Sequence, residues 1–224
     1  MSITETPITL VILAFTVLTS FAAFKDSELM RKMLLNPYLV KNHKEWYRTF
    51  SHALIHRDYI HLGFNMFVFF FFGKKLESIF TSAEKWNLYF RDIPYWGDTK
   101  GSIIYLTLYM GGLLFATLPA LSKHSNNPRY NSLGASGATS AVLLAYIFLL
   151  PLADLGFLFL IPMKAFLAGA LILIGESYMN KRGGTGIAHD AHLYGAAFGV
   201  VFILFANYRF FGNFIDQVSG YIGF

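Results

Sequence analysis

Six apolar runs decide what this chain can fold into, because each one reads as a candidate transmembrane helix. The hydrocarbon core of a bilayer requires about 20 mostly apolar residues per helix. The chain is 55% hydrophobic and only 14% charged, whereas soluble domains average about 25% charged residues. The runs cover about residues 7–24, 60–73, 101–121, 134–150, 157–177 and 191–208. They predict an all-α membrane protein in which a single domain, residues 1–224, contains six transmembrane helices.

Two connecting segments have a distinctive composition. Residues 25–59 mix aromatic and aliphatic side chains with many charges, a pattern typical of a segment that lies along a membrane interface. Residues 180–190 contain three glycines, which have little conformational preference. We therefore expect an interfacial segment after the first helix and a mobile loop before the last one.

The composition also excludes several classes of chemistry. The chain has no cysteine, so disulfides, thiolate catalysis and cysteine-ligated metal centres are impossible. Its formal net charge is +5, but the basic residues are scattered through the connecting segments. They indicate contact with the surface of the lipid bilayer and predict no nucleic acid as a partner.

A small set of polar residues lies near the N-terminal ends of alternate runs. His61 and Asn65 lie in the second run, Ser136 begins the fourth, and His192 begins the sixth. Alternate helices of a membrane bundle run in the same direction, so these three ends face the same side. The four side chains can therefore meet at one depth.

Ser136 and His192 are the residue types of nucleophilic catalysis. A serine hydroxyl is a weak nucleophile until a base removes its proton, and histidine is the usual base. Gly195 and Gly199 follow His192 at positions i+3 and i+7, on the same face of a helix. Small residues there predict a close approach to another helix.

His61 and Asn65 have a spacing of four residues, which aligns an imidazole and a carboxamide on one helix face. Both groups can donate hydrogen bonds to a developing oxyanion. The backbone N–H of Ser136, near the positive end of a helix dipole, could add another donor. None of these steps requires a metal or a cofactor.

The motifs, taken in order, resemble those of the rhomboid family of intramembrane serine proteases. Residues 134–137 read Gly-Ala-Ser-Gly, and residues 191–195, two helices later, read Ala-His-Leu-Tyr-Gly. Upstream, residues 47–56 resemble the aromatic-Arg segment of the family and residues 61–65 its His-x-x-x-Asn helix. Residues 73–77 resemble the Gly-x-x-x-Glu that follows.

The resemblance implies a role for each polar residue. Ser136 would be the nucleophile, His192 the general base and acid, and His61 and Asn65 the groups that stabilise the oxyanion. It also implies a rhomboid-like bundle in which residues 25–59 form a lateral interfacial loop. The expected function is the cleavage of transmembrane segments of other membrane proteins, without a metal or cofactor.

Three positions depart from the family pattern. Tyr47 stands where tryptophan is usual, Tyr194 where glycine is common, and Ser140 where some members carry an aromatic residue that packs on the histidine. The orientation of His192 is therefore the least defined feature. Asp190 is only two residues from His192 and would point elsewhere on a helix, so we expect a Ser-His dyad and no acid.

The family orientation places the N-terminus inside and opens the active site to the extracytoplasmic side of a cell (inner) membrane. The distribution of basic residues favours the opposite topology. Segments that lie outside in the family orientation, residues 25–59 above all, hold more lysine and arginine than the inner segments. A folded interfacial segment can hold basic residues without setting orientation, so we expect the family arrangement of a multi-pass protein.

Two other functions fit parts of the sequence. A catalytically inactive rhomboid-like protein would bind membrane clients without cutting them, although binding alone does not require the pair of Ser136 and His192. A haem or metal protein of the membrane would instead use histidine ligands. The candidates are His52, His56, His61 and His192.

Overall fold

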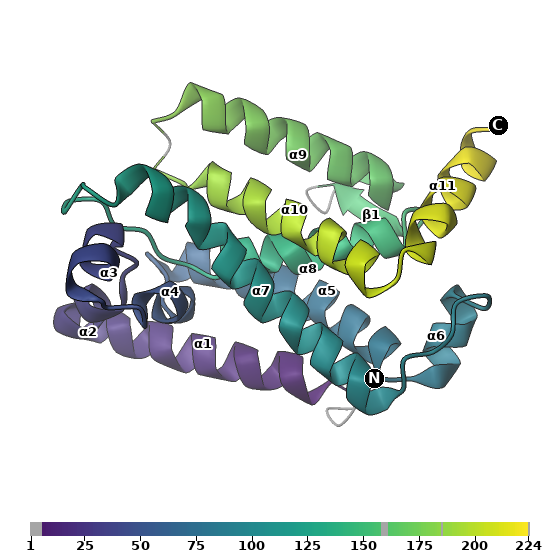
Figure 1. The fold of residues 1–224 in the computed structure, drawn as a ribbon, viewed down its shortest axis with the longest axis horizontal. Helices are drawn as coiled ribbons and strands as arrows, with labels where there is room; N and C mark the ends of the chain where they lie inside the picture. Colours follow the sequence, from purple (N-terminus) through teal and green to yellow (C-terminus); the bar gives the residue numbers. More distant parts are fainter. Residues whose placement is uncertain (1–5, 158–160, 185, 224) are drawn as a thin grey trace.

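Helices dominate the computed structural model, which describes residues 6–157, 161–184 and 186–223 (Figure 1). The helices of the bundle are α1 (Pro7–Lys25), α5 (Tyr59–Phe80), α7 (Asp98–His124), α8 (Ser136–Leu149), α9 (Ala165–Arg182) and α10 (His189–Ala206). The helices that flank them are α2 (Ser27–Met33), α3 (Pro37–His43), α4 (Arg48–Ser51), the 3-10 helix η2 (His52–Leu54), α6 (Ala83–Tyr89) and α11 (Arg209–Ile222).

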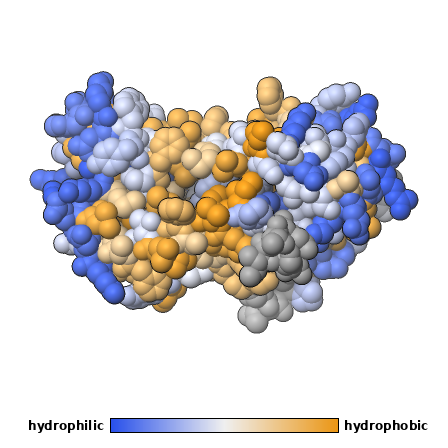
Figure 2. All heavy atoms as spheres, turned by 90° about the horizontal axis from the view of Figure 1, so that it is seen from below, coloured by the Kyte–Doolittle hydropathy of each residue, from blue (hydrophilic) through white to orange (hydrophobic). Residues whose placement is uncertain are grey.

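An apolar belt crosses the middle of the molecule. Figure 2 shows hydrophobic side chains across the centre of the face seen from below and hydrophilic ones at the two ends. The long helices expose large apolar side chains, among them Phe15, Leu18, Phe71, Ile174 and Phe205. Soluble proteins rarely expose continuous apolar surface of this kind. The belt is the surface expected of a protein surrounded by lipid.

Three of the described helices, α1, α7 and α10, are long and apolar enough to cross a membrane by length and composition. α8 is apolar but has 14 residues, most of them buried, so it forms the centre of the bundle. α5 and α9 have 22 and 18 residues, and both end in polar segments. Each predicted run thus contains a helix, whereas the count of six membrane spans stays a prediction.

The predicted fifth run, residues 157–177, is wrong at its start. Strand β1 (Asp154–Phe157) pairs antiparallel with β2 (Ile161–Lys164), and α9 begins only at Ala165; residues 158–160 lie outside the described part of the chain. A short apolar stretch does not distinguish a strand from a helix. Pro162, which lacks a backbone donor, disfavours a helix at this point.

Two helices also continue beyond their predicted ends. α5 continues past residue 73 to Phe80, and α9 continues past residue 177 to Arg182. Charged residues lower the hydropathy of both extensions, but lysine, arginine and glutamate are good helix formers. α9 therefore takes up the beginning of the predicted loop 180–190, of which residue 185 lies outside the described residues.

The predicted interfacial segment, residues 25–59, folds into α2, α3, α4 and η2, which gather at one end of α1 and α7 (Figure 1). The buried Arg48 organises it. Its Nη1 donates to three backbone carbonyl oxygens between residues 31 and 34 at 2.7–3.0 Å, and its Nε donates to Glu45 at 2.6 Å. Carbonyls at a helix end otherwise lack partners. The location of this folded segment at a membrane interface stays a prediction.

Glycines set the contact between α8 and α10. A Cβ added to Gly195 would collide with the carbonyl oxygen of Gly137, and one added to Gly199 with the carbonyl oxygen of Ala141. The two backbones therefore lie directly against each other, which confirms the predicted close approach. The contact places the N-terminal ends of α8 and α10 side by side.

Glu77 joins α5 to the beginning of α1. Its carboxylate is 1% exposed and accepts hydrogen bonds from the backbone N–H groups of Ile8 and Thr9, each at 2.8 Å. The first N–H groups of a helix have no partner within the helix and attract negative charge. A side chain from a distant helix thus caps α1 inside the protein.

We expect the substitution Glu77→Gln to destabilise the fold. A neutral amide has one oxygen to accept the two backbone N–H groups, and its own NH₂ group would face one of these donors. Leaving a buried partner unsatisfied costs about 1–3 kcal/mol. Thermal unfolding in detergent micelles measures the change. Glu28→Gln is the control, since Glu28 is exposed and pairs only with Lys32 in the same helix. Equal melting temperatures for parent and Glu77→Gln would contradict the capping role.

Candidate active site

The turn before α8 presents Ser136 as the first residue of that helix. Gly134 adopts φ +112°, a conformation that favours glycine. A Cβ at Gly134 would also lie 2.8 Å from Cε1 of His61. The glycine therefore permits both the turn and the approach of the His61 ring to it.

Two buried histidines hold this turn in place. The N–H of Gly134 donates to the carbonyl oxygen of His52 at 2.9 Å, and the N–H of Ala135 approaches Nε2 of His56 at 3.4 Å. On the other side of its ring, Nδ1 of His56 lies 3.0 Å from Oγ of Ser20, which donates to a backbone carbonyl. Burial lowers the pKa of His56 to about 3, so its Nε2 is free to accept. His56 is thus a positioning residue that sequence reasoning did not identify.

Ser136 and His192 lie in direct contact, as their places at two same-facing helix ends predict. Oγ of Ser136 is 2.7 Å from Nε2 of His192, and the glycine contact between α8 and α10 holds the two helices at this separation. A hydroxyl hydrogen-bonded to an imidazole nitrogen is the arrangement that activates a serine.

The expectation that no acid lies near His192 is wrong. Oε1 of Glu176 lies 3.1 Å from Nδ1 of His192, and its Oε2 lies 2.6 Å from Nδ1 of His189. The carboxylate comes from α9, so its distance along the sequence concealed it, whereas Asp190 pairs with Lys123 at 2.7 Å. One signal could have revealed it: Glu176 is the acidic residue of the predicted fifth run, and charge inside such a run is costly and commonly functional.

His61 and Asn65 occupy the first two turns of α5. The ring of His61 faces Gly134 and lies 5.0 Å from the ring of His56. The backbone N–H of Arg57 approaches its Nδ1 at 3.4 Å, which leaves Nε2 as the protonated donor. Asn65 is 4% exposed and donates from Nδ2 to the carbonyl oxygen of His61 at 2.9 Å. One of its two amide hydrogens is used in this way.

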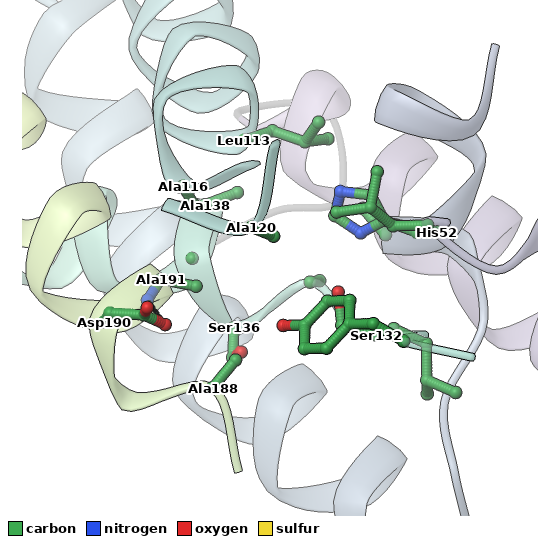
Figure 3. Close-up of a pocket in the computed structure, with 17 residues that line it drawn as sticks. His52, Leu113, Ala116, Ala120, Ser132, Ser136, Ala138, Ala188, Asp190 and Ala191 are labelled. Carbon is green, nitrogen blue, oxygen red and sulfur yellow. Dashed lines mark hydrogen bonds between the residues drawn. The ribbon is translucent and has the colours of Figure 1, made fainter. Parts of the chain in front are cut away.

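A small cavity of about 30 Å³ lies beside Ser136. Figure 3 shows His52 on one side and Ser136, Asp190 and Ala191 on the other. A cavity needs about 10–15 Å³ to hold a water molecule. His52 is buried, and within the described part of the chain neither ring nitrogen has a hydrogen-bond partner. The site therefore has room and polar groups for water.

The predicted histidine ligand set does not gather at one point. Among the described residues, the acidic and histidine side chains that converge are Glu176, His189 and His192, whose candidate ligand atoms lie within 4.8 Å of one another. A divalent metal could accept this donor set. In the structure the same atoms contact each other and Ser136, so hydrogen bonding accounts for the cluster.

Comparisons with known proteins identify the family of the chain. A family model of the rhomboid domain matches residues 43–209. A relative from Arabidopsis thaliana, described as RHOMBOID-like protein 12, mitochondrial, is 35% identical over 152 residues. The match covers 66% of this chain and 43% of the relative, so the chain spans less than half of that protein's length.

We expect acid to destabilise the fold through His52 and His56. Burial lowers the pKa of His52 to about 4, and burial with charge repulsion from His61 lowers that of His56 to about 3, compared with about 6.5 for an exposed histidine. Below pH 6.5 the unfolded chain therefore binds more protons than the folded one. The stabilisation is complete above about pH 6.5 and is lost progressively as pH falls toward 4 and then 3.

Melting temperatures in micelles at about pH 7.5 and about pH 4.5 test this linkage. A His52→Gln variant should show a shallower dependence on pH than the parent. His43→Gln, at an exposed position, should keep the parent's dependence. Identical slopes in parent and His52→Gln would contradict the assignment.

Proposed function

Because the chain belongs to the rhomboid family, we propose that it is an intramembrane serine endopeptidase that cleaves transmembrane segments of other membrane proteins. The observation that carries the proposal is the 2.7 Å contact between Oγ of Ser136 and Nε2 of His192. It lies at the N-terminal ends of two helices, one of them long and apolar enough to cross a membrane.

In the proposed reaction Ser136 attacks the scissile carbonyl carbon while Nε2 of His192 takes the hydroxyl proton. The tetrahedral intermediate collapses to an acyl-enzyme, and His192 returns the proton to the leaving amine. Water then attacks the acyl-enzyme with His192 again acting as the base. The chain's own groups provide every proton transfer, so the reaction does not call for a metal or cofactor.

Stabilisation of the oxyanion is assigned to donors around the N-terminus of α8. The backbone N–H of Ser136 lies at the positive end of the helix dipole, and His61 faces the turn with Nε2 as a donor. Asn65 contributes through the amide hydrogen that its own helix does not use. Removing one donor of this kind typically costs about 10²- to 10³-fold in rate.

The apolar belt favours the proposal that the substrates are transmembrane helices of other proteins. A polar site within such a belt is costly unless water reaches it, and the cavity beside Ser136 is large enough for a water molecule. A substrate helix must unwind to expose its peptide bond, so residues that weaken helices are expected near the cleavage point. We propose that the site opens on the side of the α8 and α10 N-termini, which is extracytoplasmic in the family orientation.

An inactive client-binding protein is the second candidate, because the relative from Arabidopsis thaliana is described only as rhomboid-like. The contact between Ser136 and His192 supports the enzyme, because binding alone gives no reason to align a nucleophile with a base. The name of the relative also says mitochondrial, so the membrane in which this chain resides is either a cell membrane or an organelle membrane.

Cleavage of a model transmembrane substrate by purified protein in micelles tests the proposal. Ser136→Ala and His192→Ala should each lose activity by about 10³-fold or more, because members of a catalytic unit fail together. A chelator should leave the parent's activity unchanged. Ser140→Ala, which removes the other serine of α8, is the matched control and should keep its activity.

Labelling with a fluorophosphonate separates the remaining outcomes. A parent that labels at Ser136 and cleaves supports the protease, and equal cleavage by the parent and both catalytic variants would refute the assignment. A folded parent that neither labels nor cleaves any transmembrane substrate would support the client-binding protein instead.

A further inference from the structure

A carboxylate from α9 contacts the catalytic histidine on the side opposite the serine. Oε1 of Glu176 is 3.1 Å from Nδ1 of His192, while Oε2 is 2.6 Å from Nδ1 of His189. The two histidines are three residues apart on α10 and therefore share one helix face. His189 is 8% exposed, so the carboxylate is held between two imidazoles, one of them buried.

Packing alone does not explain this arrangement. The buried residues of α9 are Ala165, Ala168 and Gly169, all near its N-terminal end. Glu176 lies two turns further along, in a part of α9 with little buried surface. An ionisable group in an apolar run is expensive and requires compensation, which the two imidazoles provide.

The contact defines which nitrogen of His192 carries the proton. Nε2 must be unprotonated to take the proton of Ser136, so Nδ1 must carry hydrogen. A carboxylate beside Nδ1 accepts that hydrogen and selects this tautomer. It also stabilises the positive charge that forms on the imidazole when the serine proton arrives.

We infer that Glu176 is a positioning residue that completes a Ser136–His192–Glu176 triad, with His189 fixing the second carboxylate oxygen. The inference rests on the proposed function and deepens it. The serine proton moves to Nε2 of His192 and then to the leaving amine, while the Nδ1 proton stays on His192. Glu176 acts only by accepting a hydrogen bond and by its charge.

The other charged or titratable groups near His192 belong to α5, α7 and α10. His61 approaches from α5, where it faces Gly134. Asp190, on α10, is paired with Lys123 of α7 at 2.7 Å, and Tyr194 is half exposed. A substitution at Glu176 leaves all of these in place, so the contacts that it changes are those with Nδ1 of His192 and Nδ1 of His189.

The test compares the parent with Glu176→Gln, Glu176→Asp and Ser177→Ala in the cleavage assay over a range of pH. Glu176→Gln should lower kcat by at least about tenfold, toward the roughly 10⁴-fold that loss of the triad carboxylate costs in a soluble serine protease, with KM nearly unchanged. The pH dependence of kcat in Glu176→Gln should differ from that of the parent, because the substitution removes the negative charge beside Nδ1 of His192. Glu176→Asp should recover part of kcat, and Ser177→Ala should match the parent.

Histidine NMR and thermal unfolding test the role of Glu176 independently of the cleavage assay. In the parent, the Nδ1–H signal of His192, assigned by its loss in His192→Ala, should be present and should vanish or shift in Glu176→Gln. Activity is normalised to folded protein. A Glu176→Gln variant with the parent's kcat, pH profile and NMR signal would overturn the inference, as would one that is only less thermostable.

Failure of the proposed function would look different. If the folded parent neither cleaves nor labels at Ser136, the protease proposal fails, while the NMR comparison still decides whether Glu176 fixes the tautomer of His192. If the parent cleaves and Glu176→Gln is indistinguishable from it, the protease stands and the triad is wrong.

Discussion

The direct backbone contact between α8 and α10 is the constraint on which the site depends. Gly195 and Gly199 of α10 rest on the carbonyl oxygens of Gly137 and Ala141, with no space for a side chain. In a bilayer the hydrophobic effect does not drive helices together, so close packing of small residues has to do so. The separation of the two backbones fixes the distance between Ser136 and His192 at the ends of the helices.

Buried polar groups are stabilised by partners on other elements. His56 connects Ser20 of α1 to the turn before Ser136, and the carboxylate of Glu77 caps α1 from α5. Each such group would cost free energy if it were left unpaired in a dry environment. The same contacts that satisfy these groups therefore hold the helices in one arrangement, and the nucleophile turn is supported from both sides.

The sequence predicts those parts of the structure that depend on local pattern. Apolar runs locate the helices, and the parity of their directions brings Ser136 and His192 to the same side. It does not predict the hairpin at residues 154–164, because apolar composition there fits a strand or a helix equally. Nor does it predict Glu176 beside His192, since that contact depends on the rotation of α9 about its axis, which no local pattern records.

Glu77 and Glu176 show how similar carboxylates can serve different purposes. Each lies in a helix of the bundle and contacts two nitrogen atoms on another element. The donors of Glu77 are backbone N–H groups, whose charge never changes, so its interaction is the same at every stage of a reaction. The donors of Glu176 are imidazoles, and one of them contacts the serine. An interaction that strengthens when that imidazole becomes charged stabilises a transition state more than the ground state, which is the condition for lowering a barrier. The kind of donor, rather than the carboxylate itself, is what separates the structural glutamate from the one proposed to act in catalysis.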